Sequence, residues 1–346
     1  MNVDESAGQL PVSRSATTRS APLEIFSTPL AWSIRYAASK GGSTLAIGNF
    51  DGIHLGHQAI LRASVERAQE IQAVPTALTF DPLPQKVLRP ESAPLRVTTT
   101  EQRLRCFAEL GIEAALVLPF THDLAKLTPE EFVDQILVRD LKVRAVFVGE
   151  NFRFGHKQAG NARMLLLLGA ERSFDVVIIP HVVYKDEVVS STIIRREIAS
   201  GDVSHAGRLL GRPFVLTGKV VPGTGTGRRF TFPTLNLAPE QELLPARGVY
   251  VTRTLLEGES RTHRSVTNIG VRPTFNGSTL SVETHVLEPL PEISPGRIEV
   301  HFWKRLREEK KFSSPEELRA QIALDIASAD KFFSRLRRFR SSHVPV

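Results

Sequence analysis

The periodicity of apolar residues changes once along the chain, and this change limits the folds that the sequence can adopt. From residue 43 to residue 200, short strand-like runs alternate with stretches whose apolar residues recur at helical spacing. Such alternation predicts a parallel β-sheet covered by helices, an α/β architecture. Strands are expected at 44–47, 76–80, 114–118, 145–148 and 176–180, and helices at 58–71, 101–110 and 130–138.

After Leu210 the apolar residues alternate with a period of two, which is typical of half-buried strands. Gly- and Pro-rich turns separate the runs, so the second half is expected to form an antiparallel barrel or sandwich. One helix should close the chain, because Ser314-Pro-Glu-Glu317 matches a capping box with proline at the first helical position. The expected strands are 214–221, 248–255, 280–287 and 297–302, and the buried stripe of the helix is Leu318, Ile322, Ile326, Ala329 and Phe333.

These patterns divide the 346 residues into two domains and two tails. Residues 1–22 contain few large apolar side chains and are expected to be a disordered tail. An α/β domain is expected at 23–206, an all-β domain with its closing helix at 207–336, and a basic tail at 337–346.

Composition is typical of a soluble protein of the cytoplasm. No apolar run reaches the ~18 residues that span a bilayer, and the N-terminus has no signal-peptide core. The single cysteine, Cys106, excludes an internal disulfide framework, so a reducing cytoplasm is the expected location. Cys106 falls between apolar positions of an expected helix, which favours a structural thiol over a nucleophile.

The positive charge is concentrated in the second half. Residues 1–206 carry 22 basic and 23 acidic side chains, whereas residues 207–346 carry 22 and 14. A basic half can attract nucleic acid, membranes or nucleotide phosphates. The basic face lacks interleaved aromatic residues, so we do not expect nucleic acid as a partner. We expect no membrane partner either, since no apolar run is long enough to span a bilayer. An oligomer is possible.

A segment rich in glycine and histidine joins an expected strand to the next helix. It reads Ile47-Gly-Asn-Phe-Asp-Gly-Ile-His-Leu-Gly-His57, and α/β sheets bind ligands at such strand ends. His54 and His57 can face one way on the first helical turn, beside the partial positive charge of the helix N-terminus. Gly52 and Gly56 leave room for a nucleotide near the backbone. The segment therefore suits a triphosphate. A zinc site would need ligands that no nearby Cys/His pair supplies.

A second candidate phosphate site lies at residues 190–195, which read Ser-Ser-Thr-Ile-Ile-Arg. Hydroxyl groups at a helix start, followed by Arg195, can clamp a phosphate through the cap and the guanidinium. Simple helix capping by Ser191 and Thr192 is the alternative.

The second half contains a glycine-rich run, 218–237, that matches neither a Walker A loop nor the dinucleotide fingerprint. A flexible hairpin is one interpretation of its glycines. Thr234 and Asn236 stand two apart on an expected strand, so their oxygens can bind one Mg²⁺. Glu283 lies on another alternating strand, on the face opposite Val282. Its carboxylate is either solvated or placed to take a proton from a hydroxyl that attacks a γ-phosphate.

The 47–57 segment closely resembles the signature of nucleotidylyltransferases with the HxGH motif. Val148-Gly-Glu-Asn-Phe-Arg-Phe-Gly155 and 190–195 resemble the flavin adenylyltransferase branch. In the second half, four motifs follow the order of the riboflavin kinase family. Joined in this order, the segments are similar to the bacterial bifunctional riboflavin kinase/FMN adenylyltransferases from about Leu45 to Phe333. The kinase motifs are Phe232-Pro-Thr-Leu-Asn236, Gly248-Val-Tyr250, Thr267-Asn-Ile-Gly-Val-Arg-Pro-Thr274 and Val282-Glu-Thr-His285.

The resemblance implies FAD synthesis in two steps, by a Rossmann-like HxGH domain followed by a β-barrel kinase domain. The second half would phosphorylate riboflavin with ATP and Mg²⁺. The first half would transfer AMP from a second ATP to FMN, giving FAD and pyrophosphate. Glu283, His54 and His57 would be catalytic, Glu283 as the base on the ribityl hydroxyl. The other implied residues are Gly48, Phe50, Asp51, Gly56, Ser191, Thr192, Arg195, Gly223, Gly225 and Gly227 for ATP and phosphate, Asn151, Phe152 and Arg153 for flavin, and Thr234 and Asn236 for Mg²⁺.

The sequence departs from the family pattern in both halves. Leu83 stands where the family usually has histidine, and residues 288–296 replace an acidic, glycine-containing segment. We expect kinase activity with altered affinity. One alternative is an FMN adenylyltransferase whose kinase-like domain is impaired, and a remote one is a flavin-responsive RNA-binding regulator. In the kinase loop, Pro222, Thr224, Thr226 and Thr231 replace the usual His, Asp, Arg and Gly.

Overall fold

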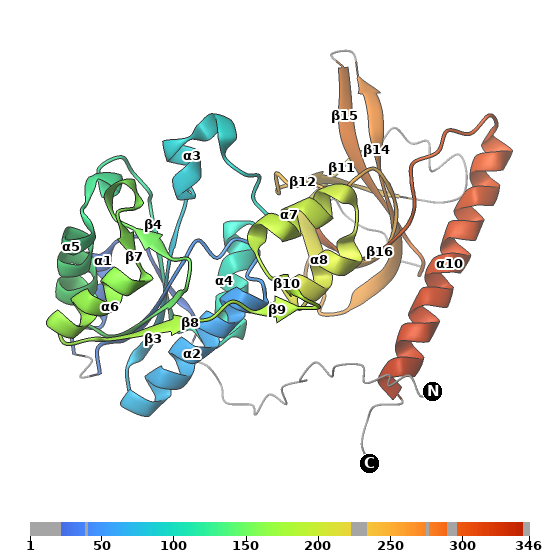
Figure 1. Cartoon of the computed structure of the whole chain (residues 1–346). Helices are drawn as coiled ribbons and strands as arrows, with labels where there is room; N and C mark the ends of the chain where they lie inside the picture. The colour runs from blue at the N-terminus through green and yellow to red at the C-terminus, as the bar shows by residue number, and fades with distance from the viewer. Residues whose placement is uncertain (1–21, 39–40, 223–233, 275–276, 289–295, 342–346) are drawn as a thin grey trace, which may run out of the picture.

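The computed structural model describes residues 22–341 except 39–40, 223–233, 275–276 and 289–295. An α/β unit is followed by a β-barrel, and helix α10 (Pro315–Ser341) lies beside the barrel on the side away from the α/β unit (Figure 1). The expected fold class is therefore confirmed. Within the described residues, no helix is both long enough and apolar enough to cross a membrane.

The α/β unit is built on six parallel strands in the order β1-β4-β3-β2-β5-β8. All five strands expected in this half are present, with ends that differ by no more than two residues. The edge strand β1 is three residues long, too short to show a periodicity. The strands are β1 (Glu24–Phe26), β2 (Ser43–Ile47), β3 (Val74–Phe80), β4 (Ala114–Leu118), β5 (Val143–Gly149) and β8 (Asp175–Ile179).

The two faces of this sheet bury side chains of different size. Alanines such as Ala46, Ala77 and Ala115 face α2 and α4, whereas larger residues such as Leu45 and Leu116 face the opposite core. Successive strand residues point to opposite faces, so this alternation is a property of the sequence. Small side chains let α2 and α4 approach the sheet closely. The helices are α1 (Pro29–Arg35), α2 (Leu55–Ile71), α3 (Pro84–Leu88), α4 (Thr100–Glu109), α5 (Pro129–Phe132) and α6 (Ala162–Glu171).

The helix expected at 130–138 is divided. Its first turn is α5, with a capping box formed by Thr128 and Glu131, and it continues as the π-helix η3 (Val133–Asp140). Periodicity does not distinguish these helix types over so few residues. The remaining short elements are η1 (Pro90–Ser92), η2 (Leu124–Lys126), β6 (Arg153–Phe154), η4 (His156–Gln158) and β7 (Gly160–Asn161).

The second unit is a closed antiparallel barrel in the order β11-β12-β15-β14-β13-β16, which decides between the expected barrel and sandwich. A chain of hydroxyl groups lies buried inside it. Thr252 bonds to Ser265 and Thr267 at 2.8 Å, and Thr267 bonds to Thr284 at 2.9 Å. These groups satisfy one another away from water. The strands are β11 (Phe214–Val221), β12 (Leu235–Pro239), β13 (Gly248–Leu256), β14 (Thr262–Thr274), β15 (Gly277–Val286) and β16 (Arg297–Arg307).

Helix α10 covers the outer face of the barrel, where Ala329 and Phe333 pack against Val251. Its capping box is formed only in part. The Ser314 hydroxyl accepts the Glu317 N–H at 3.2 Å, as expected. The Glu317 carboxylate instead accepts the N–H and hydroxyl of Ser313, at 3.1 and 2.8 Å.

The hairpin β9 (Val183–Tyr184) and β10 (Glu187–Val188) leads into α7 (Ser191–Ser200) and α8 (Val203–Leu210), which connect the units. Helix α8 packs on β16, where the Ser204 hydroxyl donates to the Trp303 carbonyl at 2.8 Å. The domain boundary expected at 206–207 thus falls inside α8.

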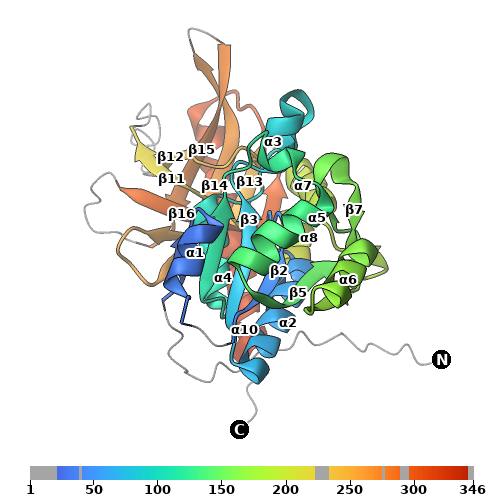
Figure 2. The same cartoon turned by 90° about the vertical axis from the view of Figure 1, so that its left-hand side faces the viewer.

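Seen from the α/β side, the barrel lies behind the parallel sheet (Figure 2). Ion pairs join the two across helix α4. Arg105 pairs with Glu299 at 2.6 Å, and Glu101 pairs with Arg297 at 2.6 Å. The α/β unit therefore has a defined position against the barrel.

Candidate active sites

The 47–57 segment leaves β2 at the carboxyl edge of the sheet and enters α2 with a strained backbone. Phe50 and Ile53 have φ angles of 48° and 40°, and Gly52 has a φ of 87°. Ile53 is β-branched and fully buried, so its left-handed conformation is an outlier. Such strain persists only where surrounding contacts hold the backbone in place.

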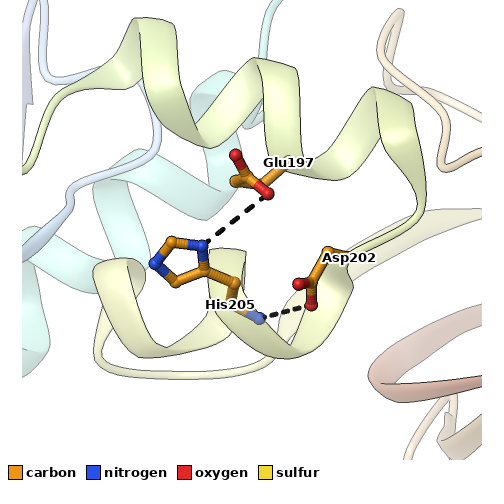
Figure 3. A group of neighbouring side chains, drawn as sticks. All are labelled: Glu197, Asp202 and His205. Atoms are coloured by element: carbon orange, nitrogen blue, oxygen red, sulfur yellow. Dashed lines mark hydrogen bonds and ion pairs between the residues drawn. The ribbon is translucent and has the colours of Figure 1, made fainter. Parts of the chain in front are cut away.

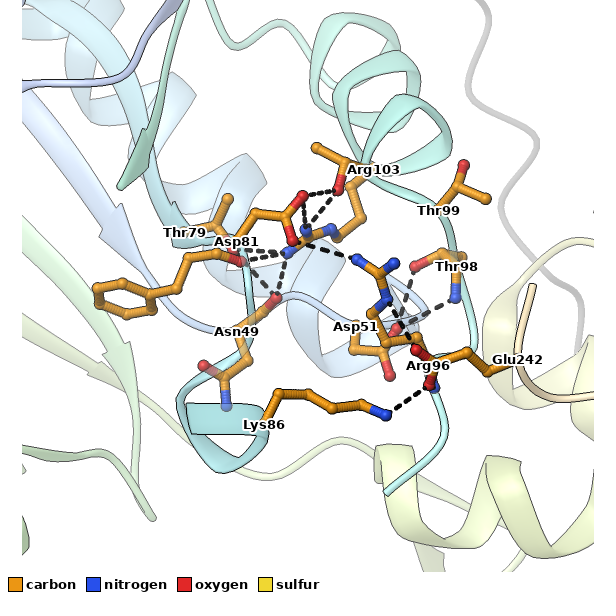
Figure 4. Close-up of polar contacts among 12 residues, drawn as sticks. Asn49, Asp51, Thr79, Asp81, Lys86, Arg96, Thr98, Thr99, Arg103 and Glu242 are labelled. Atoms are coloured by element: carbon orange, nitrogen blue, oxygen red, sulfur yellow. Dashed lines mark hydrogen bonds and ion pairs between the residues drawn. The ribbon is translucent and has the colours of Figure 1, made fainter. Parts of the chain in front are cut away.

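Asp51 supplies much of that support (Figure 4). Its carboxylate is buried and accepts the backbone N–H groups of Val97 and Thr98 at 3.0 and 3.1 Å. The Thr98 hydroxyl donates to it at 3.2 Å, and Arg195 pairs with it at 2.7 Å. Arg195 also donates to the Leu95 carbonyl at 2.9 Å. A buried charge is tolerated because it has both an ionic partner and several donors.

Arg212 holds the same segment from the barrel side. Its guanidinium donates to the carbonyls of Gly52 and Ile53 at 2.7 and 2.9 Å. Gln58 bonds to the carbonyls of Ile53 and Leu210, at 3.0 and 2.8 Å. The connection between the two units therefore fixes the strained part of the loop.

His54 and His57 lie side by side at the start of α2. Their rings stack at 3.7 Å between centroids, and His54 Nδ1 caps the helix by accepting the His57 N–H at 3.3 Å. Burial lowers the pKa of His54 to about 4, and burial together with the neighbouring His54 holds the pKa of His57 well below its usual range. Both rings are neutral at pH 7. Since His54 Nδ1 is an acceptor, its proton is on Nε2.

One atom of this pair lacks a partner. Among the described residues, His57 Nδ1 is buried and forms no hydrogen bond. Phe50 is fully buried and meets the His57 ring edge-on at 5.3 Å, so its side chain supports the imidazole. A Cβ on Gly56 would lie 3.2 Å from the His54 ring, and one on Gly48 would lie 3.2 Å from Phe50.

Residues 190–195 lie directly against this loop. Ser190, not Ser191 or Thr192, caps α7, because its hydroxyl accepts the Ile193 N–H at 3.3 Å. The Ser191 hydroxyl instead donates to the Asp51 carbonyl at 2.9 Å. Thr192 is exposed. The structure thus brings Ser191 and Arg195 together with Asp51.

Three aromatic residues, Phe80, Phe120 and Phe152, stand at the carboxyl ends of strands β3, β4 and β5. Phe80 ends β3 and meets Phe120, after β4, edge-on at 5.5 Å. Phe152 follows β5, is half-buried and stacks on Phe154 at 5.4 Å. Asn151 and Arg153 beside it are exposed. Sequence reasoning did not include Phe80 and Phe120. Their signal is an aromatic residue at the end of successive strands.

Arg103 is a second buried group that the motifs did not reveal (Figure 4). It is 1% exposed and donates to the carbonyls of Asn49 and Phe80 at 3.1 and 3.2 Å, and to the Thr79 hydroxyl at 3.0 Å. It therefore ties the loop after β2 to the loop after β3. A lone arginine on a helix gives no sequence signal for such a role.

In the barrel, Glu283 on β15 is paired in register with Asn236 on β12 and with Asn268 on β14. In-register residues on adjacent strands share one face of the sheet. This is the face opposite Thr284, whose hydroxyl lies inside the barrel, as the sequence predicted for Glu283. Asn236 is 9% exposed. Thr234 directly precedes β12 and is half-buried. Gly223, Gly225, Gly227, Thr224, Thr226 and Thr231 lie outside the described residues.

Glu197, Asp202 and His205 form a separate cluster in which one ligand atom from each lies within 4.8 Å of the others (Figure 3). Their contacts explain this proximity. Asp202 caps α8 by accepting the His205 N–H at 2.9 Å. The His205 ring lies 3.7 Å from Glu197 and 3.5 Å from Glu187. The cluster joins α7 to α8, and we assign it no ion.

Comparison with known proteins identifies both halves. Residues 37–193 match the family model for FAD synthetase, and residues 210–333 match the model for riboflavin kinase. The bifunctional riboflavin kinase/FMN adenylyltransferase of Escherichia coli is 36% identical over 86% of this chain and 94% of its own. The chain belongs to this bifunctional family. The enzyme of the same description from Pseudomonas fluorescens is 38% identical over 83% of this chain and 92% of its own.

A crystal structure from Streptococcus pneumoniae, described as a macrolide-efflux protein, has the same overall fold. It superimposes with a TM-score of 0.76 over 84% of this chain and 94% of its own, at 28% identity. Membership of the bifunctional family makes the chain a transferase that synthesises FAD in two steps, with riboflavin, FMN and FAD as substrates and products. The single-activity and RNA-binding alternatives are not favoured.

The low pKa of His54 makes stability depend on pH. The folded chain takes up this proton near pH 4, the unfolded chain near pH 6.5, so the free energy of unfolding falls as pH drops from 6.5 toward 4. Between pH 7 and 5, His54 alone accounts for about 2 kcal/mol of this decrease. His54→Asn keeps a cap acceptor and should remove this part of the loss. Urea unfolding at pH 7 and 5 measures it.

The exposed His122 offers a matched control. His122→Asn should retain the full pH dependence of the parent chain. An unchanged pH dependence in His54→Asn would show that His54 titrates normally in the folded protein.

Proposed function

We propose that adenylyl transfer takes place where the 47–57 loop meets residues 190–195. The observation that carries this assignment is the neutral histidine pair at the N-terminus of α2, with a buried imidazole nitrogen that lacks a partner in the described structure. In this proposal His54 Nε2–H and His57 donate to phosphate oxygens, together with backbone N–H groups at the start of α2. Ser191, Thr192 and Arg195 are the proposed further contacts to ATP.

In this reaction an oxygen of the FMN phosphate attacks the α-phosphorus of ATP. A new P–O bond forms, the bond between the α-phosphorus and the bridging oxygen breaks, and pyrophosphate leaves with the electron pair. No protein nucleophile is required, so the chain acts by positioning and by stabilising charge on the α-phosphate. We propose that the flavin binds beside the aromatic residues at the carboxyl edge of the parallel sheet, with Phe152, Asn151 and Arg153 as contacts.

We further propose that riboflavin is phosphorylated on the outer face of the barrel, at the row formed by Asn236, Glu283 and Asn268. Glu283 would take the proton from the ribityl hydroxyl as that oxygen attacks the γ-phosphorus of ATP; the bond between the γ-phosphorus and the β–γ bridging oxygen breaks, and ADP leaves with the electron pair. The oxygen donors Thr234 and Asn236 fit a hard cation such as Mg²⁺. When bound, Mg²⁺ would neutralise phosphate charge. The alternation of strand faces, which places Glu283 beside Asn236, supports this assignment.

Replacing His57 tests the adenylyl site. His57→Ala should lower the rate of FMN conversion to FAD by ~10²-fold, as for removal of a transition-state donor. Riboflavin phosphorylation should persist. Chromatography of flavins after addition of ATP and either riboflavin or FMN gives both rates, and undiminished FAD output would refute the assignment.

The kinase site has its own test. Glu283→Gln keeps the shape of the side chain but removes its basicity, so phosphorylation of riboflavin should fall by ~10²-fold or more. Conversion of added FMN to FAD should continue at the parent rate. Equal loss of both steps would contradict a model with two separate sites.

A further inference from the structure

Four consecutive residues, Leu95 to Thr98, contact four different parts of the molecule. We call this segment the 95–98 strap. The Leu95 carbonyl accepts from Arg195 at 2.9 Å, and the N–H groups of Val97 and Thr98 donate to Asp51 at 3.0 and 3.1 Å. The strap thus contacts both members of the Asp51–Arg195 ion pair, so the position of the strap determines the positions of these two side chains.

The remaining residue of the strap, Arg96, is bound by the barrel. Its backbone N–H donates to Glu242 Oε2 at 3.2 Å, and its Nε lies 3.8 Å from Glu242 Oε1. Glu242 belongs to the loop between β12 and β13. The same carboxylate pairs with Lys86 of helix α3 at 2.9 Å (Figure 4). One barrel side chain therefore fastens both the strap and α3.

From Arg96 the contacts continue into the loop after β3. Arg96 Nη1 donates to Asp81 at 3.2 Å, and the Thr100 hydroxyl also donates to Asp81. Thr100 in turn accepts from the buried Arg103 at 3.0 Å. The contacts of Glu242 thus lead to the loops after β2 and after β3, which both border the proposed adenylyl site.

We propose that Glu242 of the kinase barrel is a positioning residue for adenylyl transfer. By fixing the 95–98 strap and α3, it holds Asp51 and Arg195 in the arrangement that receives ATP. The inference rests on the proposed adenylyl site and adds a contribution to that site from the other domain.

The test uses the full chain with Glu242→Gln, which removes the charge and keeps the size. Conversion of FMN to FAD should fall about tenfold in kcat/KM, mainly through a higher KM for ATP, because small misplacements of positioning groups are costly. Riboflavin phosphorylation should stay at the parent rate. Glu240→Gln is the control, because Glu240 stands on the same loop and its pair with Arg297, at 2.6 Å, leads to Glu101 of α4 rather than to the strap. It should leave the KM for ATP unchanged.

Ionic strength separates positioning from a general structural role. The side chains of Glu242, Lys86 and Arg96 are 32%, 29% and 28% exposed, so salt reaches these ion pairs. Raising salt from about 0.01 M to about 0.15 M shortens the Debye length from about 30 to about 8 Å. Because salt weakens the ion pairs that only the parent can form, the difference in the KM for ATP between the parent and Glu242→Gln should become smaller. Glu242→Asp should restore part of the lost activity.

Three outcomes would overturn the inference: an unchanged KM for ATP in Glu242→Gln, equal loss of both activities, or a difference from the parent that salt does not alter. Failure of the proposed adenylyl site is recognised separately, since His57→Ala would then leave FAD formation intact. With His57→Ala impaired and Glu242→Gln unimpaired, only the role of Glu242 is refuted.

Discussion

The ion pair between the buried Asp51 and the half-buried Arg195 is the interaction on which the arrangement of the proposed α/β site depends. It joins the loop after β2, the strap before α4 and the helix α7, which are separated by 46 to 144 residues along the chain. Removing one member of such a pair typically costs about 3–5 kcal/mol, because the other charge stays buried. This ion pair and the hydrogen bonds from Arg212 hold Phe50 and Ile53 in their left-handed conformations.

The parallel sheet beneath the 47–57 loop also helps to position helix α2. Alanines on one face allow α2 to lie close to the strands, so its N-terminus stands at the carboxyl edge of β2. Phe50 fills the space between α2 and α4, with its ring 5.3 Å from His57 and 5.5 Å from Phe107. Packing in the core, through Phe50, therefore sets the orientation of the His57 imidazole.

Sequence periodicity predicted most strands of the parallel sheet and the barrel, because each is a local pattern of apolar residues, but it did not predict helices α1, α3, α6 and α8. The HxGH segment and residues 190–195 were found as motifs, and the structure places them together. The supporting contacts could not be found in this way. Arg103, Arg212 and Glu242 act through single side chains, and their distant partners lie 23 to 160 residues away. No local pattern encodes such pairings. Even a recognised helix start can be misplaced by one residue, since Ser190 and not Ser191 caps α7.

Helix α3 is held by one apolar contact, at Leu83, and one polar contact from the barrel. The helix has five residues and no side-chain cap, so its own hydrogen bonds contribute little to its stability. Its position depends on tertiary contacts, of which the structure provides a buried Leu83 at its start and the pair between Lys86 and Glu242. A leucine side chain at this position can be buried but cannot form a hydrogen bond. The barrel then supplies a polar contact to α3, and a segment at the edge of the proposed adenylyl site is fastened by the riboflavin kinase domain.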